Sequence, residues 1–466
     1  MPSHDSIPVR GGPILPLLRK ELRDLTLARP FWWALIIVVL LTGYSYVQAA
    51  QLYGEVSKSA LGLPVLARGL SPLDGIMAPT FGALYLAATF LFPFVVIRTV
   101  AAEKQADSLK LLVQLPYSTI ALVVTKLTAC IFAWGVMLFP CLIALAFWRA
   151  SGGHIDPVEA ANLILGHFLY ALVIAAISLL AAATTQNVGG AGILALAVTL
   201  GFWVLDFAAT GDNGLLKSLS GLSLTHVLRA FERGIFSLPA VLSSLLVVLG
   251  LVAVSGICLH PGRRVARKRG LTLAVAAAIG AAVFAATRVH VFRDATEDRR
   301  NSFSTTDEAD LRALDGRLTV EVHLAAEDPR YYDFERNILG KLRRIVSDME
   351  VVFPDAGFDR VLTGGSDEAY GQIIYSIGDR RLKSRSTSEE EVLPIIFDLA
   401  GRQRRPAENA VEYPGYPLIA QTNSAQIAFY YMLPAVVAAC WWFAQHGVHL
   451  RDSRRRLEPE LPRRSP

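Results

Sequence analysis

Asp206 and His167 are ionisable residues inside long apolar stretches of the sequence. Asp206 occurs in FWVLDFAATGD and His167 in LILGHFLYAL, each toward one end of its stretch. Carboxylate and imidazole groups are costly to bury in hydrocarbon, so residues of this kind can line a path for an ion or solute. Transfer along such a path is the chemistry that Asp206 and His167 could support. Contact with lipid headgroups or with a neighbouring helix is the simpler alternative.

Other patterns typical of catalysis are absent from the sequence. G-x-x-x-x-G-K-[ST], H-E-x-x-H and G-x-S-x-G do not occur, which excludes these forms of the phosphate-binding loop, the zinc-protease helix and the hydrolase nucleophile turn. The cysteines lie in apolar runs without metal-site spacing, and we expect them to be small buried hydrophobic residues. They are Cys130, Cys141, Cys258 and Cys440. We therefore expect no catalytic residue, metal or cofactor in this chain.

The apolar stretches that hold these residues also define the fold class. The chain has 466 residues, of which 53% are hydrophobic and 18% charged, and its mean hydropathy is +0.41. Because about 20 apolar residues in a helix cross a bilayer, we predict an α-helical polytopic membrane protein with about eight transmembrane helices and a small extracytoplasmic α/β domain. The predicted spans are 31–50, 79–98, 120–147, 160–183, 189–209, 237–259, 271–289 and 425–445.

Basic residues are distributed as membrane topology requires. They gather before the first span and again in HPGRRVARKRG (260–270) and RDSRRRLEPELPRRSP (451–466), whereas the loops 51–78 and 149–159 are poor in Lys and Arg. The positive-inside rule then places both termini in the cytoplasm. The net charge of +5 is explained by this topology, and we expect no nucleic-acid partner.

Two segments are predicted to lie outside the cytoplasm. Residues 290–424 are polar, and RLTVEVHLA (317–325) and GQIIYSI (371–377) alternate as strands do. The loop 210–236 is amphipathic but is interrupted by Ser and Gly, so we expect it to lie in the membrane interface or to dip into it without spanning.

Two helices are predicted within the external domain. Apolar residues recur at helical spacing through 332–350, the last of them Met349. A second helix is predicted within 386–403, with Ser388 three residues before an acidic residue as in a capping box. Pro394 must then lie in the first turn of this helix or kink it.

The cytoplasmic stretch RTVAAEKQADSLKLLVQLPYS (98–118) is charged yet contains regularly spaced leucines. Glu103 and Lys104 lie near its start, and Pro116 ends the leucine series. The leucines are Leu109, Leu112 and Leu115. A narrow apolar stripe on a charged helix suits a groove on a partner protein. A solvated loop with scattered leucines fits the same residues equally well.

A family resemblance distinguishes between these two interpretations. AAEKQADSLKLLVQLPYSTIALVVTK (101–126) resembles the E-x-x-x-G-T-L-E-L-L-x-x-x-P-x-S-x-x-x-x-x-x-K signature of ABC-2-type transporter permeases, although 106–108 depart from its Gly-Thr. In that family this segment is the cytoplasmic coupling helix, which seats in a cleft of the ATPase subunit. The amphipathic segment 17–29, with Lys20 and Glu21, is similar to the family's interface helix. The matching residues are Glu103, Leu109, Leu111 or Leu112, Pro116, Ser118 and Lys126.

Two further segments resemble the gliding-motility-associated members of this family. LSLTHVLRAFERGIFSLPAV (222–241) is similar to the stretch before their last core span, and 293–325 is similar to the opening of their external-domain partner subunit. Phe303 replaces the usual Leu, and the external domain is much shorter than in that partner. The matching residues are Ser223, His226, Phe231, Gly234 and Leu238 in the first segment and Asp294, Thr296, Arg299, Ser302, Ser304 and Thr306 in the second.

The resemblance implies a division of the chain into six parts. They are an interface helix (1–30), a six-span permease core (31–270), a seventh span (271–289), the external domain (290–424), an eighth span (425–445) and a basic cytoplasmic tail (446–466). The expected location is the bacterial inner membrane. The expected partners are an ABC ATPase, a second permease half that is most simply a copy of this chain, membrane lipid, and a periplasmic or cell-envelope protein.

The implied function is ATP-driven export of a substrate, with ATP and Mg bound by the ATPase subunit, so that this chain is not itself an enzyme. The coupling interface would comprise Lys20, Glu21, Glu103, Lys104, Leu109, Leu112, Leu115 and Pro116. An alternative is an ATP-driven mechanotransmission or assembly complex that acts on an extracytoplasmic protein and moves no solute. A simple membrane anchor for the external domain is a third possibility.

Overall fold

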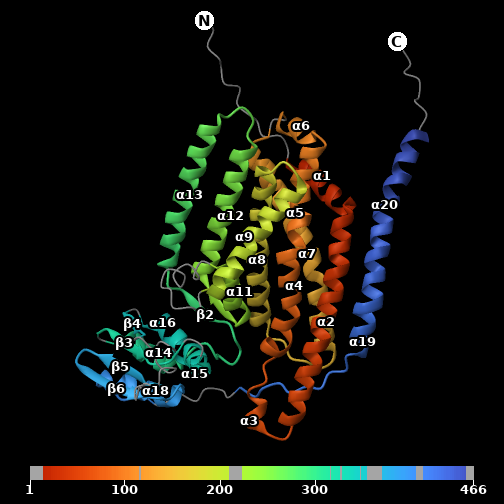
Figure 1. The fold of residues 1–466 in the computed structure, drawn as a ribbon. Coiled ribbons are helices and arrows are strands. Elements are labelled where there is room, and N and C mark those ends of the chain that lie inside the picture. The colour runs from red at the N-terminus through yellow and green to blue at the C-terminus, as the bar shows by residue number, and fades with distance from the viewer. Residues whose placement is uncertain are drawn as a thin grey trace, which may run out of the picture. The chain divides into compact units, whose positions relative to one another are not determined.

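The computed structural model describes residues 14–114, 117–208, 223–314, 316–325, 328–346, 348–353, 370–405 and 413–457 (Figure 1). Within these ranges the side chains of 205–208 and 447–457 are not described. The predicted interface residues Leu115 and Pro116 therefore lie outside the described residues, as does the side chain of Asp206.

The chain divides into two compact units, a helical unit and an α/β unit. The helical unit comprises Met1–Trp203, Pro239–Val289 and Gly415–Pro466, and the α/β unit comprises Val204–Leu238 and His290–Pro414. The α/β unit thus contains most of the predicted external domain. It also includes the segment that was expected to lie in the membrane interface.

The described residues of the helical unit include seven helices that are long and apolar enough to cross a membrane. The protein is therefore a multi-pass helical membrane protein. These helices are α2 (Arg29–Ala60), Leu73–Gln105 (η1 Leu73–Met77, α4 Ala78–Phe90 and α5 Phe92–Gln105), α7 (Thr119–Ala150), α8 (Pro157–Thr184), α12 (Leu238–Leu259), α13 (Val265–Thr287) and Asn423–His446 (α19 Asn423–Ile427, η3 Ala428–Met432 and the start of α20, Leu433–Leu457). The predicted span 189–209 corresponds to α9 (Val188–Ala208). The apolar part of this helix, Val188–Val204, is shorter than the seven helices above.

Close helix contacts hold the last span and its approach segment against α2. Gly43 has no side chain where the ring of Phe429 packs, so any larger residue at this position would clash with it. Farther along α2, the hydroxyl of Tyr53 donates to the carbonyl of Tyr416 at 2.8 Å, and the amide of Leu418 donates to the Ser57 hydroxyl at 3.0 Å. These bonds explain why residues from Gly415 onward belong to the helical unit and not to the α/β unit.

The α/β unit is built around a four-stranded sheet in the order β4–β3–β5–β6. The strands are β3 (Leu318–Val322), β4 (Met349–Val352), β5 (Ile373–Ile377) and β6 (Arg380–Ser384). β3 and β4 are parallel, and the other pairs are antiparallel. Alternate residues of β3 are buried, as a sheet with one covered face requires. The two predicted strands are confirmed.

The first predicted helix of this unit ends earlier than expected. It is formed by α15 (Pro329–Phe334), η2 (Glu335–Leu339) and α16 (Gly340–Ile345), and the backbone turns extended at Val346. The prediction that Met349 lies on the helix is wrong, because Met349 begins β4 and pairs with Leu318. An apolar residue four positions after Ile345 fits either structure, and pairing with β3 decides between them.

The second predicted helix is confirmed as α18 (Glu389–Leu399), which begins directly after Ser388. The Ser388 side chain makes no capping hydrogen bond, so this half of the predicted capping box is wrong. Pro394 lies inside the helix and beyond its first turn. The helix nevertheless buries Val392, Ile396 and Phe397 in the same hydrophobic core as the sheet residues. This packing outweighs the backbone hydrogen bond that Pro394 cannot donate.

A short ribbon joins two distant segments within the α/β unit. β1 (Ile235–Ser237) pairs antiparallel with β2 (Phe292–Asp294), and the Ala295 amide donates to the Gly234 carbonyl at 2.8 Å. Just before β1, α11 (Leu224–Glu232) packs the ring of Phe231 edge-on to Phe236. The described part of the predicted membrane-interface loop is therefore part of the α/β unit. Strand pairing provides hydrogen-bond partners for its backbone, and contacts between aromatic rings cover its apolar face.

Candidate functional site

The first helix carries a buried carboxylate on its apolar face. In α1 (Ile14–Leu27) the buried residues are Leu17, Glu21 and Leu25, spaced four apart so that they lie on one side. Only 2% of Glu21 is exposed. A buried carboxylate needs a cationic or hydrogen-bonding partner to offset its lost hydration. The sequence places that partner 105 residues away.

Lys126 of α7 is the partner, and its side chain is fully buried. Its ammonium lies 2.9 Å from each carboxylate oxygen of Glu21 and 2.7 Å from the carbonyl of Thr99. These contacts use the three ammonium protons. The Glu103 Oε2 atom lies 2.7 Å away as an ion pair, without an aligned hydrogen bond. Lys126 therefore joins α1, α5 and α7.

A second lysine closes the cluster on its solvent side. The ammonium of Lys20 donates to Glu103 and also pairs with Glu21 and Asp24, each at 3.2 Å. Partial burial alone would lower the pKa of Lys20, but the hydrogen bond to Glu103 and the charges of the three carboxylates together raise it above its ordinary value. We call Lys20, Glu21, Asp24, Glu103 and Lys126 the charge cluster.

The charge cluster specifies how α1, α5 and α7 pack. A buried ion pair adds little net stability compared with apolar residues, because dehydration offsets attraction, but removing one member leaves an uncompensated buried charge. Only the arrangement that brings all three helices together satisfies Glu21, Glu103 and Lys126. The cluster therefore favours this one arrangement of the three helices.

Lys104, next to Glu103, binds a different helix. Its ammonium donates to the carbonyls of Ala182, Ala183 and Thr185 at 2.6, 2.7 and 2.9 Å. These groups belong to the last turn of α8 and its C-cap, where carbonyls lack helical partners and the helix dipole favours a cation. Glu103 and Lys104, both predicted to contact a partner, thus have contacts within the chain.

The predicted coupling segment forms a short helix after a tight turn. α5 ends at Gln105, Asp107 adopts a left-handed backbone with φ 52°, and α6 (Ser108–Gln114) follows. Leu109 is buried and Leu112 half-buried, whereas 66% of Leu111 is exposed. The leucine that α6 presents to solvent is therefore Leu111, which is not in the predicted stripe.

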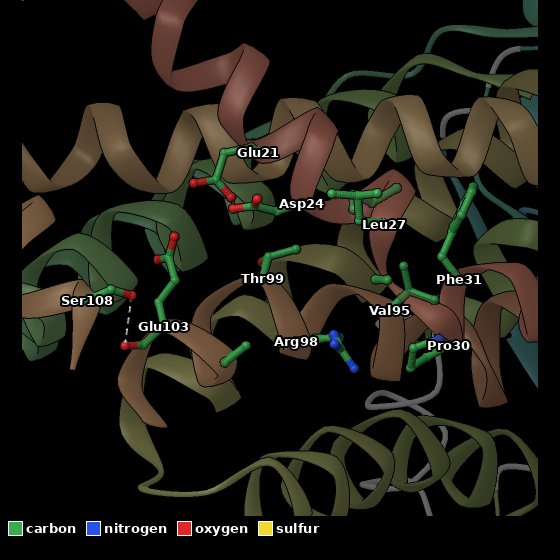
Figure 2. Close-up of a pocket in the computed structure, with 13 residues that line it drawn as sticks. Glu21, Asp24, Leu27, Pro30, Phe31, Val95, Arg98, Thr99, Glu103 and Ser108 are labelled. Carbon is green, nitrogen blue, oxygen red and sulfur yellow. Dashed lines mark hydrogen bonds between the residues drawn. The ribbon is translucent and has the colours of Figure 1, made fainter. Parts of the chain in front are cut away.

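A pocket of about 300 Å³ lies beside the charge cluster. Figure 2 shows Glu21, Asp24 and Glu103 on one side of it and Leu27, Phe31 and other apolar side chains on the other. Arg98 also lines the pocket. A pocket with an acidic and an apolar wall is suited to receive a side chain or segment that has both a cationic and an apolar part.

The predicted pathway residue His167 is not part of this site, and the side chain of Asp206, the other predicted pathway residue, lies outside the described residues. His167 lies in α8, is 1% exposed, and packs against the ring of Phe81 with centroids 5.2 Å apart. Asp206 lies in the last turn of α9. A pathway role for either residue stays a prediction.

Several residues of the site were missed by sequence reasoning as functional residues. Lys126 was noted only as a motif match, and Asp24, Thr99 and Arg98 were not singled out. One signal could have found Lys126, since a lysine in TIALVVTKLTACIF is a charged residue within an apolar helix. Nothing in the sequence signals that Thr99 offers its backbone carbonyl.

Among the described residues, no group of three or more His, Cys, Asp and Glu side chains could hold a metal ion. The charge cluster can hold α1, α5 and α7 in place relative to one another. Comparison of the chain with protein-family models, with curated proteins and with solved structures found no match.

Proposed function

We propose that this chain is the membrane-spanning subunit of an ABC-2-type transporter, which couples ATP hydrolysis by a separate ATPase to export of a substrate. The observation that carries the proposal is the charge cluster, which joins α1, α5 and α7 directly beside α6. A force applied to α6 would pass through the turn at Asp107 into α5 and through Lys126 into α7. In this proposal both termini lie in the cytoplasm of a bacterial inner membrane, and a second copy of the chain completes the permease.

The surface that would meet the ATPase differs from the predicted stripe. Glu103, Lys104 and Leu109 are engaged within the chain, so they would hold α6 in place while its exposed residues make the contact. Leu111 and its neighbour Lys110 are described side chains of α6 that are exposed for this contact. An exposed leucine on a charged helix is suited to an apolar groove.

Affinity purification of the tagged full-length chain from its native membrane tests this proposal. We expect an ATPase with a Walker-type sequence to copurify with the wild type and with Leu382→Asp, and to be lost from Leu111→Asp. Leu382 is the matched control, because it is an exposed leucine of β6 in the α/β unit. Absence of an ATPase under several detergents, or equal loss from both variants, would contradict the proposal.

One observation favours mechanotransmission as a second candidate function. β1 ends at Ser237 and α12 begins at Leu238, so the ribbon of the α/β unit continues into a membrane helix without a linker. ATP-driven movement of α12 would then shift the ribbon directly. ATP-dependent protease sensitivity of the α/β unit in proteoliposomes, without accumulation of any solute, would support this function over export.

A further inference from the structure

The α/β unit contains a pocket of about 470 Å³ whose walls are mainly polar. It lies beside the β1–β2 ribbon, between the loop that follows β2 and the helices α14 (Thr305–Arg312) and α16. Four arginines line it: Arg293, Arg299, Arg312 and Arg344. A pocket of this size accommodates a small molecule or a headgroup.

The acidic residues of this pocket are already engaged by other groups of the chain. The Asp294 carboxylate accepts hydrogen bonds from the Thr296 amide at 2.9 Å and the Thr296 hydroxyl at 2.6 Å. It also accepts from the Asn301 amide at 2.8 Å and the Ser302 hydroxyl at 2.6 Å. Glu308, the other acidic residue of the lining, pairs with Arg312 at 2.8 Å.

The remaining arginines keep their charge available. Neither Arg293 nor Arg299 makes a side-chain hydrogen bond or ion pair with any residue that the structure describes. Arg344 is half-buried and donates to the carbonyl of Asn301 at 2.6 Å, which is a neutral acceptor. Among the residues that the structure describes, these three guanidinium groups thus have no carboxylate partner of their own at salt-bridge distance.

The backbone fixes the position of one of these arginines. Arg299 adopts a left-handed conformation with φ 53°, which is unfavourable for a residue with a long side chain. The turn is held because the Arg299 amide donates to the Thr296 carbonyl at 3.3 Å and the Ser302 amide donates to the Arg299 carbonyl at 3.0 Å. Asp294 anchors both ends of the same loop. Backbone strain that several hydrogen bonds hold in place is often found at functional sites.

From these contacts we propose that the pocket binds the phosphate group of an anionic ligand. Guanidinium groups donate paired hydrogen bonds to phosphate and carboxylate oxygens. Three of them offer more donors than the two oxygens of a carboxylate can accept, so phosphate is the better match. His290 follows the end of α13 by three residues, so the phosphate can belong to a phospholipid headgroup or to a soluble phosphate ester.

Binding to the purified full-length chain in a neutral, phosphate-free detergent tests this proposal in two arms. In the first, glycerol 3-phosphate is titrated calorimetrically, with succinate as the carboxylate comparison. In the second, dioleoylphosphatidylglycerol is added and the retained lipid is counted by native mass spectrometry. Binding in the first arm indicates a soluble ester, and binding in the second alone indicates a lipid headgroup.

The variants separate the pocket from general electrostatic attraction. We expect Arg293→Gln and Arg299→Asn to weaken binding at least tenfold, and Arg381→Gln, an exposed arginine of β6, to change it less than twofold. Asn tolerates the left-handed backbone, and both substituted side chains are exposed, so the variants are expected to unfold at the wild-type temperature. Failure of both probes to bind, succinate binding as tight as that of glycerol 3-phosphate, or an equal loss in Arg381→Gln would overturn the proposal.

Discussion

Lys126 in the helical unit and Asp294 in the α/β unit are each held by several polar contacts, but the two charged residues organise very different lengths of chain. The acceptors of Lys126 come from two other helices, as far as 105 residues away. The donors to Asp294 lie within eight residues of it. One residue therefore specifies how helices pack, and the other specifies how one loop folds.

This difference follows from what surrounds each residue. Lys126 is fully buried among apolar helices, where carboxylates and a helix carbonyl replace its lost water. Asp294 is half-buried at the start of a loop, where backbone amides are free to bond a carboxylate. A buried charge in a bundle must find distant partners, whereas a carboxylate in a loop can use adjacent ones.

The largest expected effect comes from Lys126→Met. The substitution leaves Glu21 and Glu103 buried without their central cation, and loss of one member of a buried pair costs about 3–5 kcal/mol. We expect a large fall in the thermal unfolding temperature of the helical unit in detergent. Lys110→Met is the control, because its pair with Asp107 is exposed on both sides, and it should change little.

A triple variant sharpens the interpretation of this result. Replacing Glu21, Glu103 and Lys126 together by Met removes the orphaned charges as well as the cation, so it should be less destabilising than Lys126→Met alone. If the triple variant is the least stable, the cost does not arise from uncompensated burial.

An intermediate and local effect is expected from Asp294→Ala. The amides of Thr296 and Asn301 lose their acceptor, and a buried group left unsatisfied costs roughly 1–3 kcal/mol. Hydrogen exchange should rise in 295–302 while α2 and α7 keep the wild-type rate. Asp379→Ala, at an exposed turn, should leave both regions unchanged, and faster exchange throughout the bundle would contradict the comparison.

The smallest effect is a pH dependence at Asp328. The hydrogen bond from Arg330 and the one from Tyr370 hold the pKa of Asp328 down at about 2. An unfolded aspartate titrates near a pKa of about 3.9, so the folded state binds fewer protons, and the stabilisation is present above that pH and lost as pH falls toward 2. The gap in unfolding temperature between the wild type and Asp328→Asn should therefore narrow from pH 5 to pH 2.5. A constant gap would show that titration of Asp328 does not contribute.

Much of the fold follows from local patterns in the sequence. Apolar runs of bilayer length predict the membrane helices, and alternation predicts β3 and β5. Met349 was misassigned because its position fits both the spacing of apolar residues in a helix and their alternation in a strand. Only pairing with a partner strand could decide its structure. The β1–β2 ribbon was also missed, because three-residue strands carry too little pattern to be recognised alone.

The candidate site was predictable in its segments but not in its contacts. Motif matching selected Glu103 and Lys126, and Lys104 was expected in the same coupling segment. The sequence does not show that Glu103 pairs with Lys126 or that Lys104 binds the end of α8. Likewise, leucine spacing on a seven-residue helix does not reveal which leucine faces solvent. Packing against the rest of the bundle decides that Leu111 is exposed.

The β1–β2 ribbon has a consequence for biosynthesis. β1 leaves the ribosome first, and its partner is synthesised only after both α12 and α13. During that interval the edge of β1 and the carbonyl of Gly234 are unpaired, and the α/β unit cannot complete its first ribbon. Closing the ribbon therefore requires α13 to bring the chain back to the side of the membrane where α12 began. A nascent chain whose α13 fails to insert would keep this edge open to proteases and chaperones, so the ribbon links maturation of the α/β unit to correct insertion of the helix pair.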